Sequence, residues 1–107
     1  MPCKMVILAS RADDWSHEEC IEYMETEHAP LVEGLPGLVR YTSSVPSAPE
    51  AAGVDYVAQL YFEDAAAMDA AFDSETGAAV QADAAEFLDT DALRMVAVGE
   101  ETVHVEE

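Results

Sequence analysis

The sequence predicts one α+β domain, with a four-stranded antiparallel sheet and its helices on one face. This prediction rests on the order of the patterns along the chain, which is strand, helix, strand and then strand, helix, strand again. Two such split β-α-β units form the ferredoxin-like arrangement. The length of 107 residues agrees with a single domain over 1–107.

The first unit begins with the apolar run 3–10, CKMVILAS, which is typical of a strand covered on both faces. Ser16 and Glu19 then fit a capping box, in which each side chain accepts a backbone N–H at a helix start. Pro30 is expected to weaken or end this helix, because proline has no N–H donor. After a Pro-Gly turn, residues 38–45 are β-branched and aromatic, as in a second strand.

The second unit follows residues 46–53, a Pro/Ala/Gly-rich stretch that we interpret as an exposed connection. Residues 55–63 alternate as a strand does, with one wholly apolar face and one mixed face. A second helix follows, with a continuation that starts at Ser74. Residues 93–98 are the predicted fourth strand, and residues 102–105 a short terminal one.

Helices on one face leave the other face of the sheet bare, although the strands are apolar on both sides. A bare apolar sheet face is expected to pair with another surface. The simplest partner is a second copy of the chain, packed sheet against sheet. The sequence therefore predicts a homodimer.

The charge of the chain excludes several kinds of partner. It has 23 acidic residues against four basic ones, for a formal net charge of -19. Nucleic-acid binding needs a cationic footprint, and an anionic membrane surface would repel this chain. No apolar run is long enough to span a bilayer and no signal peptide is visible, so we expect a cytoplasmic protein.

The same charge is expected to strain the fold at low ionic strength through self-repulsion. Molar salt would remove most of that strain, since the Debye length falls to about 3 Å. With only one lysine in the chain, this favours the salt-rich cytoplasm of a halophilic organism. An acidic protein of an ordinary cytoplasm is the alternative.

The two cysteines, Cys3 and Cys20, are too few for a disulfide framework and are expected to be buried small apolar side chains. A metal site has little support. His17 and Cys20 lie three residues apart on one helix, but zinc usually takes four closely spaced ligands.

His28 is the leading candidate for function. It lies near the predicted end of the first helix, beside the apolar stripe that contains Ile21 and Met24. It could face a cavity as a general base, a proton donor or a ligand-anchoring group. Alternatively, it could cap the last carbonyls of the helix, a purely structural role.

Four further residues are candidates for ligand binding. Gln59 and Tyr61 share the mixed face of the third strand, and Tyr41 lies on the second strand. Polar tips on apolar walls suit a small hydrophobic ligand with one oxygen or nitrogen, although they could instead lie at the sheet rim or in a dimer contact. Arg40, like Arg94, could bind a carboxylate ligand, or could pair with acidic side chains of adjacent strands.

Several segments resemble the EthD-like family of the dimeric α+β barrel superfamily. They are MVILASR, SHEECIEYMETEHAPLV, LPGLVRY, AQLYFEDAAAMDAAF and AEFLD, and HAPLV followed by LPGL is the most specific. The resemblance covers about residues 4–105. It implies that two ferredoxin-like monomers join their sheets into a barrel, and it places His28 in the motif of the family.

The resemblance also implies a function. The namesake of the family is tied to degradation of an alkyl ether alongside an oxidising system. Relatives in the superfamily include cofactorless monooxygenases, muconolactone isomerases, polyketide cyclases and haem-dependent enzymes. We therefore expect a cofactor-independent enzyme or accessory of oxidative catabolism that acts on a small apolar molecule. His28 would supply the acid–base chemistry, while Tyr61, Gln59 and Tyr41 would orient the substrate.

Two alternatives stay open. The chain could be a non-catalytic ligand-binding module, or a structural accessory that partners an oxidoreductase. No cofactor is expected, and a haem with His28 as its axial ligand is the alternative by analogy with the superfamily.

Overall fold

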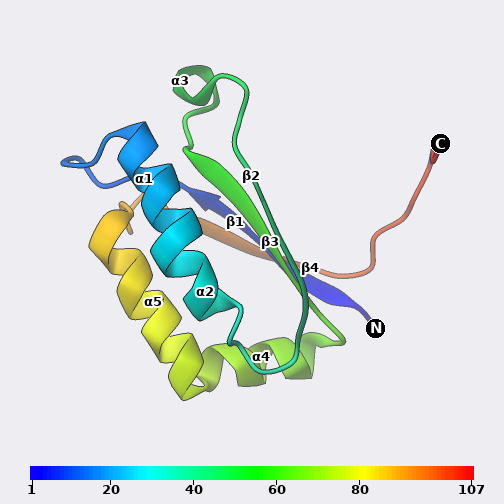
Figure 1. Ribbon diagram of the computed structural model, residues 1–107. Helices are drawn as coiled ribbons and strands as arrows, with labels where there is room; N and C mark the ends of the chain where they lie inside the picture. The colour runs from blue at the N-terminus through cyan, green and yellow to red at the C-terminus, as the bar shows by residue number, and fades with distance from the viewer.

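The computed structural model describes residues 1–107 and consists of one helical layer packed on one sheet (Figure 1). The sheet has four antiparallel strands in the order β2-β3-β1-β4. The strands are β1 Cys3–Ala9, β2 Leu38–Ser44, β3 Tyr56–Phe62 and β4 Arg94–Val98. The predicted ferredoxin-like fold is confirmed. None of the helices is both long and apolar enough to cross a membrane.

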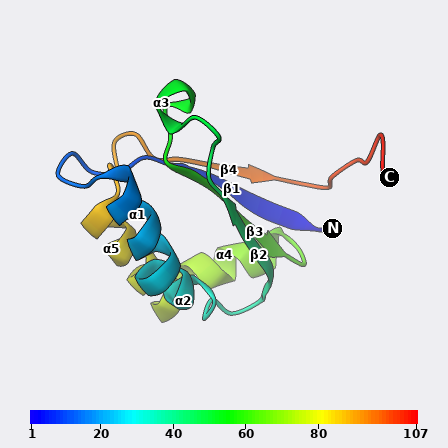
Figure 2. The same cartoon turned by 45° about the horizontal axis from the view of Figure 1, so that its top comes forward.

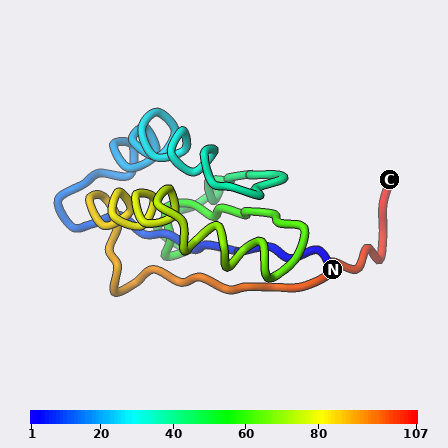
Figure 3. Tube along the Cα trace, turned by 90° about the horizontal axis from the view of Figure 1, so that it is seen from below, coloured from blue at the N-terminus to red at the C-terminus, as the bar shows by residue number.

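The helices lie on one side of the sheet, as Figures 2 and 3 show for α1 and α5. One continuous helical segment consists of α1 His17–Tyr23, the π-helical turn η1 Met24–His28 and α2 Ala29–Val32. A second helical segment consists of α4 Ala65–Asp73 and α5 Glu75–Phe87, and a single turn, α3 Pro49–Ala52, lies in the exposed connection before β3.

The helix starts follow the sequence signals. Ser16 Oγ accepts the backbone N–H of Glu19 at 3.1 Å, and Glu19 Oε1 accepts that of Ser16 at 2.9 Å, so the capping box is formed. Ser74 caps α5 through the N–H of Gly77 at 3.0 Å. A Cβ at Gly77 would lie only 2.4 Å from the carbonyl oxygen of Ala71, so the close approach of α4 and α5 requires glycine.

The expectation that Pro30 weakens or ends the first helix holds in part, because the helix continues past Pro30 but its regular hydrogen-bond pattern is interrupted by a π turn just before it. The backbone N–H of Ala29 reaches the carbonyl of Met24, five residues earlier, and the helix continues to Val32. This wider π turn places Pro30 in the first turn of α2, where a missing N–H costs little. Single π turns are frequently found at functional sites, and His28 is the last residue of this one.

The predicted terminal strand at 102–105 is wrong. Beyond β4, residues 99–107 form no strand and extend away from the body of the protein (Figures 1 and 3). The free edge of β4, whose only paired neighbour is β1, is not used by this segment, and residues 101–107 are all exposed.

The two faces of the sheet differ in burial. On β3, Tyr56, Ala58, Leu60 and Phe62 are buried beneath the helices, whereas the alternate residues between them are only half-buried. We call the face turned away from the helices the open face. Cys20 is fully buried in the helical layer, and burial raises the pKa of its thiol to about 11.

Candidate functional site

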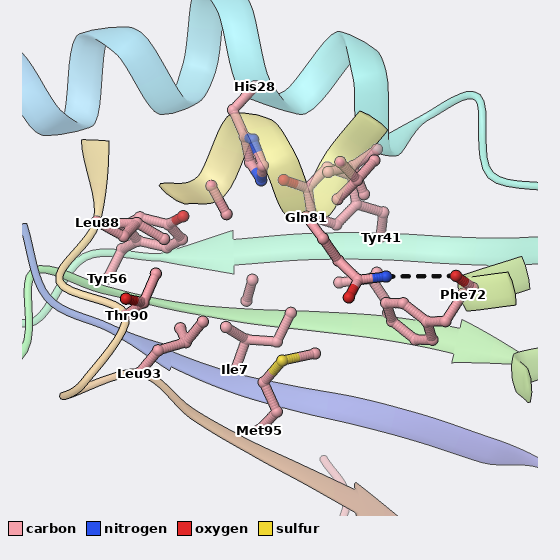
Figure 4. A pocket seen from close by; sticks show the side chains of 15 residues that line it. Ile7, His28, Tyr41, Tyr56, Phe72, Gln81, Leu88, Thr90, Leu93 and Met95 are labelled. Carbon is pink, nitrogen blue, oxygen red and sulfur yellow. Dashed lines mark hydrogen bonds between the residues drawn. The ribbon is translucent and has the colours of Figure 1, made fainter. Parts of the chain in front are cut away.

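A pocket of about 230 Å³ lies between the helical layer and the sheet (Figure 4). Twelve of its fifteen lining residues are hydrophobic, and they come from all four strands as well as from α2, α4 and α5. The other three lining residues are His28, Gln81 and Thr90. The pocket is therefore an apolar chamber with few polar groups, as small-molecule sites generally are.

His28 projects from the helical layer toward the sheet (Figure 4) and is only 6% exposed. Its Nδ1 lies 2.8 Å from Oδ2 of Asp83 on α5. Its Nε2 makes no hydrogen bond to the protein. Since every fully buried side-chain nitrogen or oxygen of the chain has a hydrogen-bond partner, Nε2 is not fully buried. Nε2 is therefore open to the pocket that His28 lines. The imidazole bonds a carboxylate, not the carbonyls at the helix end.

Asp83 selects one of the two tautomers that a neutral imidazole can adopt. An ionised carboxylate only accepts hydrogen bonds, so the neutral ring of His28 holds its proton on Nδ1 and presents the lone pair of Nε2 to the pocket. A base oriented by a third group in this way is the usual arrangement in proton-transfer sites. Nε2 can accept a proton or a hydrogen bond, and the protonated ring can donate one.

The other oxygen of Asp83 accepts a hydrogen bond from the hydroxyl of Tyr23 at 2.6 Å. This bond to the carboxylate, with burial, raises the pKa of Tyr23 to about 12. Sequence reasoning missed both residues. Asp83 is one of many acidic residues on helices and lies 55 positions from His28, so no local signal could have linked the two.

Tyr41 lines the same pocket as His28, so the structure brings these two predicted site residues together. Burial, with a smaller contribution from Glu33, raises the pKa of the Tyr41 hydroxyl to about 12. Burial also raises the pKa of Tyr56, a second tyrosine of the pocket. Both hydroxyls are therefore neutral at ordinary pH and can donate or accept hydrogen bonds.

The other three predicted residues lie on the open face. Arg40 pairs with Tyr61 across β2 and β3, with its guanidinium carbon 5.2 Å from the ring centre. The hydroxyl of Tyr61 lies 3.5 Å from Oε1 of Gln59 on the same face. The expected single cavity with His28, Tyr61 and Gln59 is therefore not formed.

Gln59 and Tyr61 are on the open face through the alternation of β3, and a β-bulge in β2 explains why Tyr41 does not join them there. The register pairs Leu38 with Phe62 and then Arg40 with Tyr61, so one extra residue is inserted in β2. In a regular ladder Tyr41 would lie opposite Gln59, whereas the bulge places it opposite Leu60 on the pocket face. Simple alternation along β2 could not reveal the change of face.

The geometry gives no support to the metal or haem alternatives. No three His, Cys, Asp or Glu side chains are grouped as a metal site would require. The pocket of 230 Å³ is smaller than the roughly 300–1,000 Å³ of pockets for drug-sized ligands.

A second histidine–aspartate pair lies outside the pocket. Nδ1 of His17 is 2.7 Å from Oδ1 of Asp55, which is buried just before β3. Arg11 bonds the same carboxylate through its backbone N–H at 2.8 Å and its guanidinium at 2.6 Å. Burial alone would raise the pKa of Asp55, but these hydrogen bonds and the arginine charge together lower it.

The solved structures with the same fold include three informative ones. An ethyl tert-butyl ether D (EthD) family protein from Bacillus halodurans C-125 has a TM-score of 0.81 and 23% identity, covering 95% of this chain and 100% of that one. A dimeric ferredoxin-like protein of unknown function from Thermobifida fusca YX has a TM-score of 0.75 and 18% identity, covering 94% of this chain and 92% of that one. SnoaB, a cofactor-independent oxygenase from Streptomyces nogalater, has a TM-score of 0.71 and 16% identity, covering 98% of both chains.

Identities this low show a common fold only. No protein of curated function matches the sequence. The family comparison is more specific, because the EthD domain matches residues 12–91, which include the first helix, the β2-β3 hairpin and α5. His28, Tyr41 and Asp83 all lie within the matched range. The chain belongs to the EthD domain family.

Proposed function

We propose that the pocket binds a small, neutral, mostly apolar molecule with one hydroxyl or carbonyl group, and that His28 holds or moves a proton at that group. The single observation behind this proposal is the state of the imidazole. Its Nδ1 is fixed by Asp83 at 2.8 Å, and its unpaired Nε2 borders an apolar pocket.

The charges near the pocket favour a neutral ligand. None of the four basic side chains lines it, and Asp83 stands directly behind His28. A carboxylate or phosphate ligand would find no counterion except a protonated His28. In a chain with a formal net charge of -19, an anionic ligand is also repelled at long range.

The geometry supports proton transfer without a cofactor. Nε2 of His28 would take a proton from a hydroxyl or an acidic carbon, and Asp83 would stabilise the imidazolium that forms. The neutral hydroxyl of Tyr41 would donate a hydrogen bond to the substrate oxygen. The description of SnoaB as a cofactor-independent oxygenase supports a role of this kind in oxidative catabolism.

The alternative is a non-catalytic role, as a ligand-binding module or as an accessory that partners an oxidoreductase. It is supported by the lining of the pocket, because twelve of the fifteen residues are hydrophobic and only two of these twelve, Tyr41 and Tyr56, carry a polar group. Product formation separates the two possibilities. Binding without turnover by any candidate substrate would favour the accessory role.

A homodimer built through the open face is also part of this proposal. The open face has no covering layer within the chain, and Val96 on it is 40% exposed. The descriptions of three matching structures as dimeric ferredoxin-like proteins support it. Light scattering in molar salt tests this, and a monomeric mass would contradict it.

Ligand selectivity tests the pocket proposal. We would titrate the protein with 2-naphthol, naphthalene and 2-naphthoate, which share one ring system and differ in the polar group. The expected order of affinity is 2-naphthol, then naphthalene, then the anion. Histidine nitrogen NMR should show that only 2-naphthol perturbs Nε2 of His28. Tighter binding of 2-naphthoate would overturn the neutral-ligand proposal.

A pair of variants on α5 locates the binding site. Ala84 lines the pocket, whereas Ala82 is exposed on the same helix. We expect A84L to fill the pocket and abolish 2-naphthol binding, and A82L to leave it unchanged. Equal effects of the two substitutions would show that the ligand binds elsewhere.

A further inference from the structure

The few cations of the chain are concentrated on the open face. Three of the four basic residues, Lys4, Arg40 and Arg94, belong to it, and only Arg11 lies elsewhere. The open face contains no acidic residue; by register it consists of Lys4, Val6, Leu8, Arg40, Thr42, Ser44, Val57, Gln59, Tyr61, Arg94, Val96 and Val98. In a chain with 23 acidic residues, this is a basic and apolar surface.

Two of these cations, Arg40 and Arg94, have no counterion within the chain. Lys4 and Arg40 flank Tyr61 in one row across the sheet, each 5.2 Å from the centre of its ring. Lys4 pairs with Glu101 at 3.2 Å, whereas Arg40 and Arg94 make no ion pair within the chain. Packing two bare open faces together would gather these charges in one contact, which is costly unless carboxylates join them.

Residues 99–107, which we call the acidic arm, have the complementary character. The arm contains Glu100, Glu101, Glu106 and Glu107. Between them, Val103 is 56% exposed and Val105 is 86% exposed, so both present apolar surface to solvent. Figures 1 and 3 show the arm leaving the body beside the start of β1.

The reach of the acidic arm suits an exchange between two copies. Nine extended residues span about 30 Å, which is comparable with the width of a small domain. The pair between Lys4 and Glu101 shows that the first part of the arm already engages a cation of the open face. The later glutamates make no ion pair with Arg40 or Arg94 of their own protomer, and a second copy would bring another open face to them.

We propose that in the dimer each acidic arm crosses to the open face of the other copy, where its glutamates pair with Arg40 and Arg94. The alternating valines of the arm would cover apolar residues of that face. This inference rests on the homodimer proposed above. It also states how two strongly acidic chains associate, since the arm supplies the negative charge that the contact needs.

A charge-matched pair of variants tests the arm. E106Q/E107Q removes two negative charges from the arm, and E18Q/E25Q removes two from exposed positions of the helical layer. Loss of negative charge at positions outside the dimer contact, as in E18Q/E25Q, reduces the repulsion between copies and should strengthen association. The arm variant should instead weaken the dimer by about fivefold at 0.15 M salt, because it loses two ion pairs per arm. Sedimentation equilibrium measures both dissociation constants.

The outcomes separate the arm from the dimer itself. If both variants strengthen association equally, the arm proposal is overturned while the dimer stands. If the unmodified protein is monomeric at all concentrations and salts, the dimer proposal fails and the arm proposal with it. Neither result affects the pocket, which is tested by 2-naphthol binding.

Zero-length cross-linking of amines to carboxylates gives an independent measurement of where the acidic arm lies in the dimer. R40K adds a lysine at the proposed contact and preserves the charge, whereas A85K adds one to the exposed side of α5. In dimers mixed from two isotope-labelled forms, R40K should join Glu106 or Glu107 of the other copy, and A85K should not. Links from A85K that are as frequent as those from R40K would indicate a freely moving arm and overturn the proposal.

Discussion

Two histidine–aspartate pairs involve one continuous helical segment, one at its first residue and the other at the junction of η1 and α2. His17 begins α1 and bonds Asp55, and His28 ends η1 and bonds Asp83. Both contacts use Nδ1, at 2.7 and 2.8 Å. By residue type, atom and distance the pairs are nearly the same, so these features do not distinguish a functional histidine from a structural one.

The surroundings of the two pairs differ. Asp55 also binds Arg11, so the first pair joins the loop after β1, the start of α1 and the start of β3. The second pair has no cation near it, and its histidine lines the pocket. The role of such a pair therefore depends on what the remaining ring nitrogen, Nε2, faces.

The largest effect is expected from Asp55→Asn. It removes the charge that binds Arg11 and His17, and should lower the free energy of unfolding by about 2 kcal/mol. We take a value below the range for fully buried pairs because the Arg11 side chain is 42% exposed. Denaturant unfolding in molar salt measures the loss, and the affinity for 2-naphthol of the folded protein should not change. A loss below about 0.5 kcal/mol would show that the cluster contributes little.

The acid dependence of that difference follows from the pKa of Asp55. This pKa lies below its ordinary value of 3.8 in the folded protein, so its stabilising contribution is complete above that value. The contribution is lost as the pH falls through the folded pKa. The stability gap between wild type and Asp55→Asn should therefore be constant from pH 5 to 7 and narrow below about pH 4. A gap that widens in acid would contradict the sign of the shift.

Substituting each of the two histidines in turn is expected to have the next largest effect and to separate their roles. His28→Gln should weaken 2-naphthol binding by about tenfold, since one charge-assisted or neutral hydrogen bond at a ligand is worth roughly 1.4 kcal/mol. His17→Gln should leave binding unchanged and lower the stability by about 1 kcal/mol through its lost bond to Asp55. Isothermal titration and denaturant unfolding of both variants give the two readouts. Equal binding losses would mean that the two pairs do not differ in role.

The sequence was sufficient for the fold because local signals and the order of elements agree. The capping box at Ser16, the alternation on β3 and the repeated β-α-β order each point to the observed arrangement. Of the residues that the sequence pointed to as site candidates, His28 and Tyr41 line one pocket, but the sequence did not indicate how they are arranged.

The arrangement itself depends on features that have no local signal. One inserted residue in β2 moves Tyr41 to the pocket face and Arg40 to the open face. A π turn carries the helix past Pro30 and orients His28 toward α5. Asp83 becomes its partner only through the packing of two helices that are distant in sequence.

The smallest effect is expected from Tyr23→Phe. It removes one of the two hydrogen bonds to Asp83, at 2.6 Å, but the carboxylate retains its bond to His28. The stability should fall by about 1 kcal/mol and 2-naphthol affinity by less than about threefold, because Nε2 still faces the pocket. The matched change Asp83→Asn should cost more affinity, since an amide can also donate to the ring and no longer selects one tautomer. If Tyr23→Phe cost as much affinity as His28→Gln, binding would depend on Tyr23 as much as on His28, and a single hydrogen bond from Nε2 would not account for it.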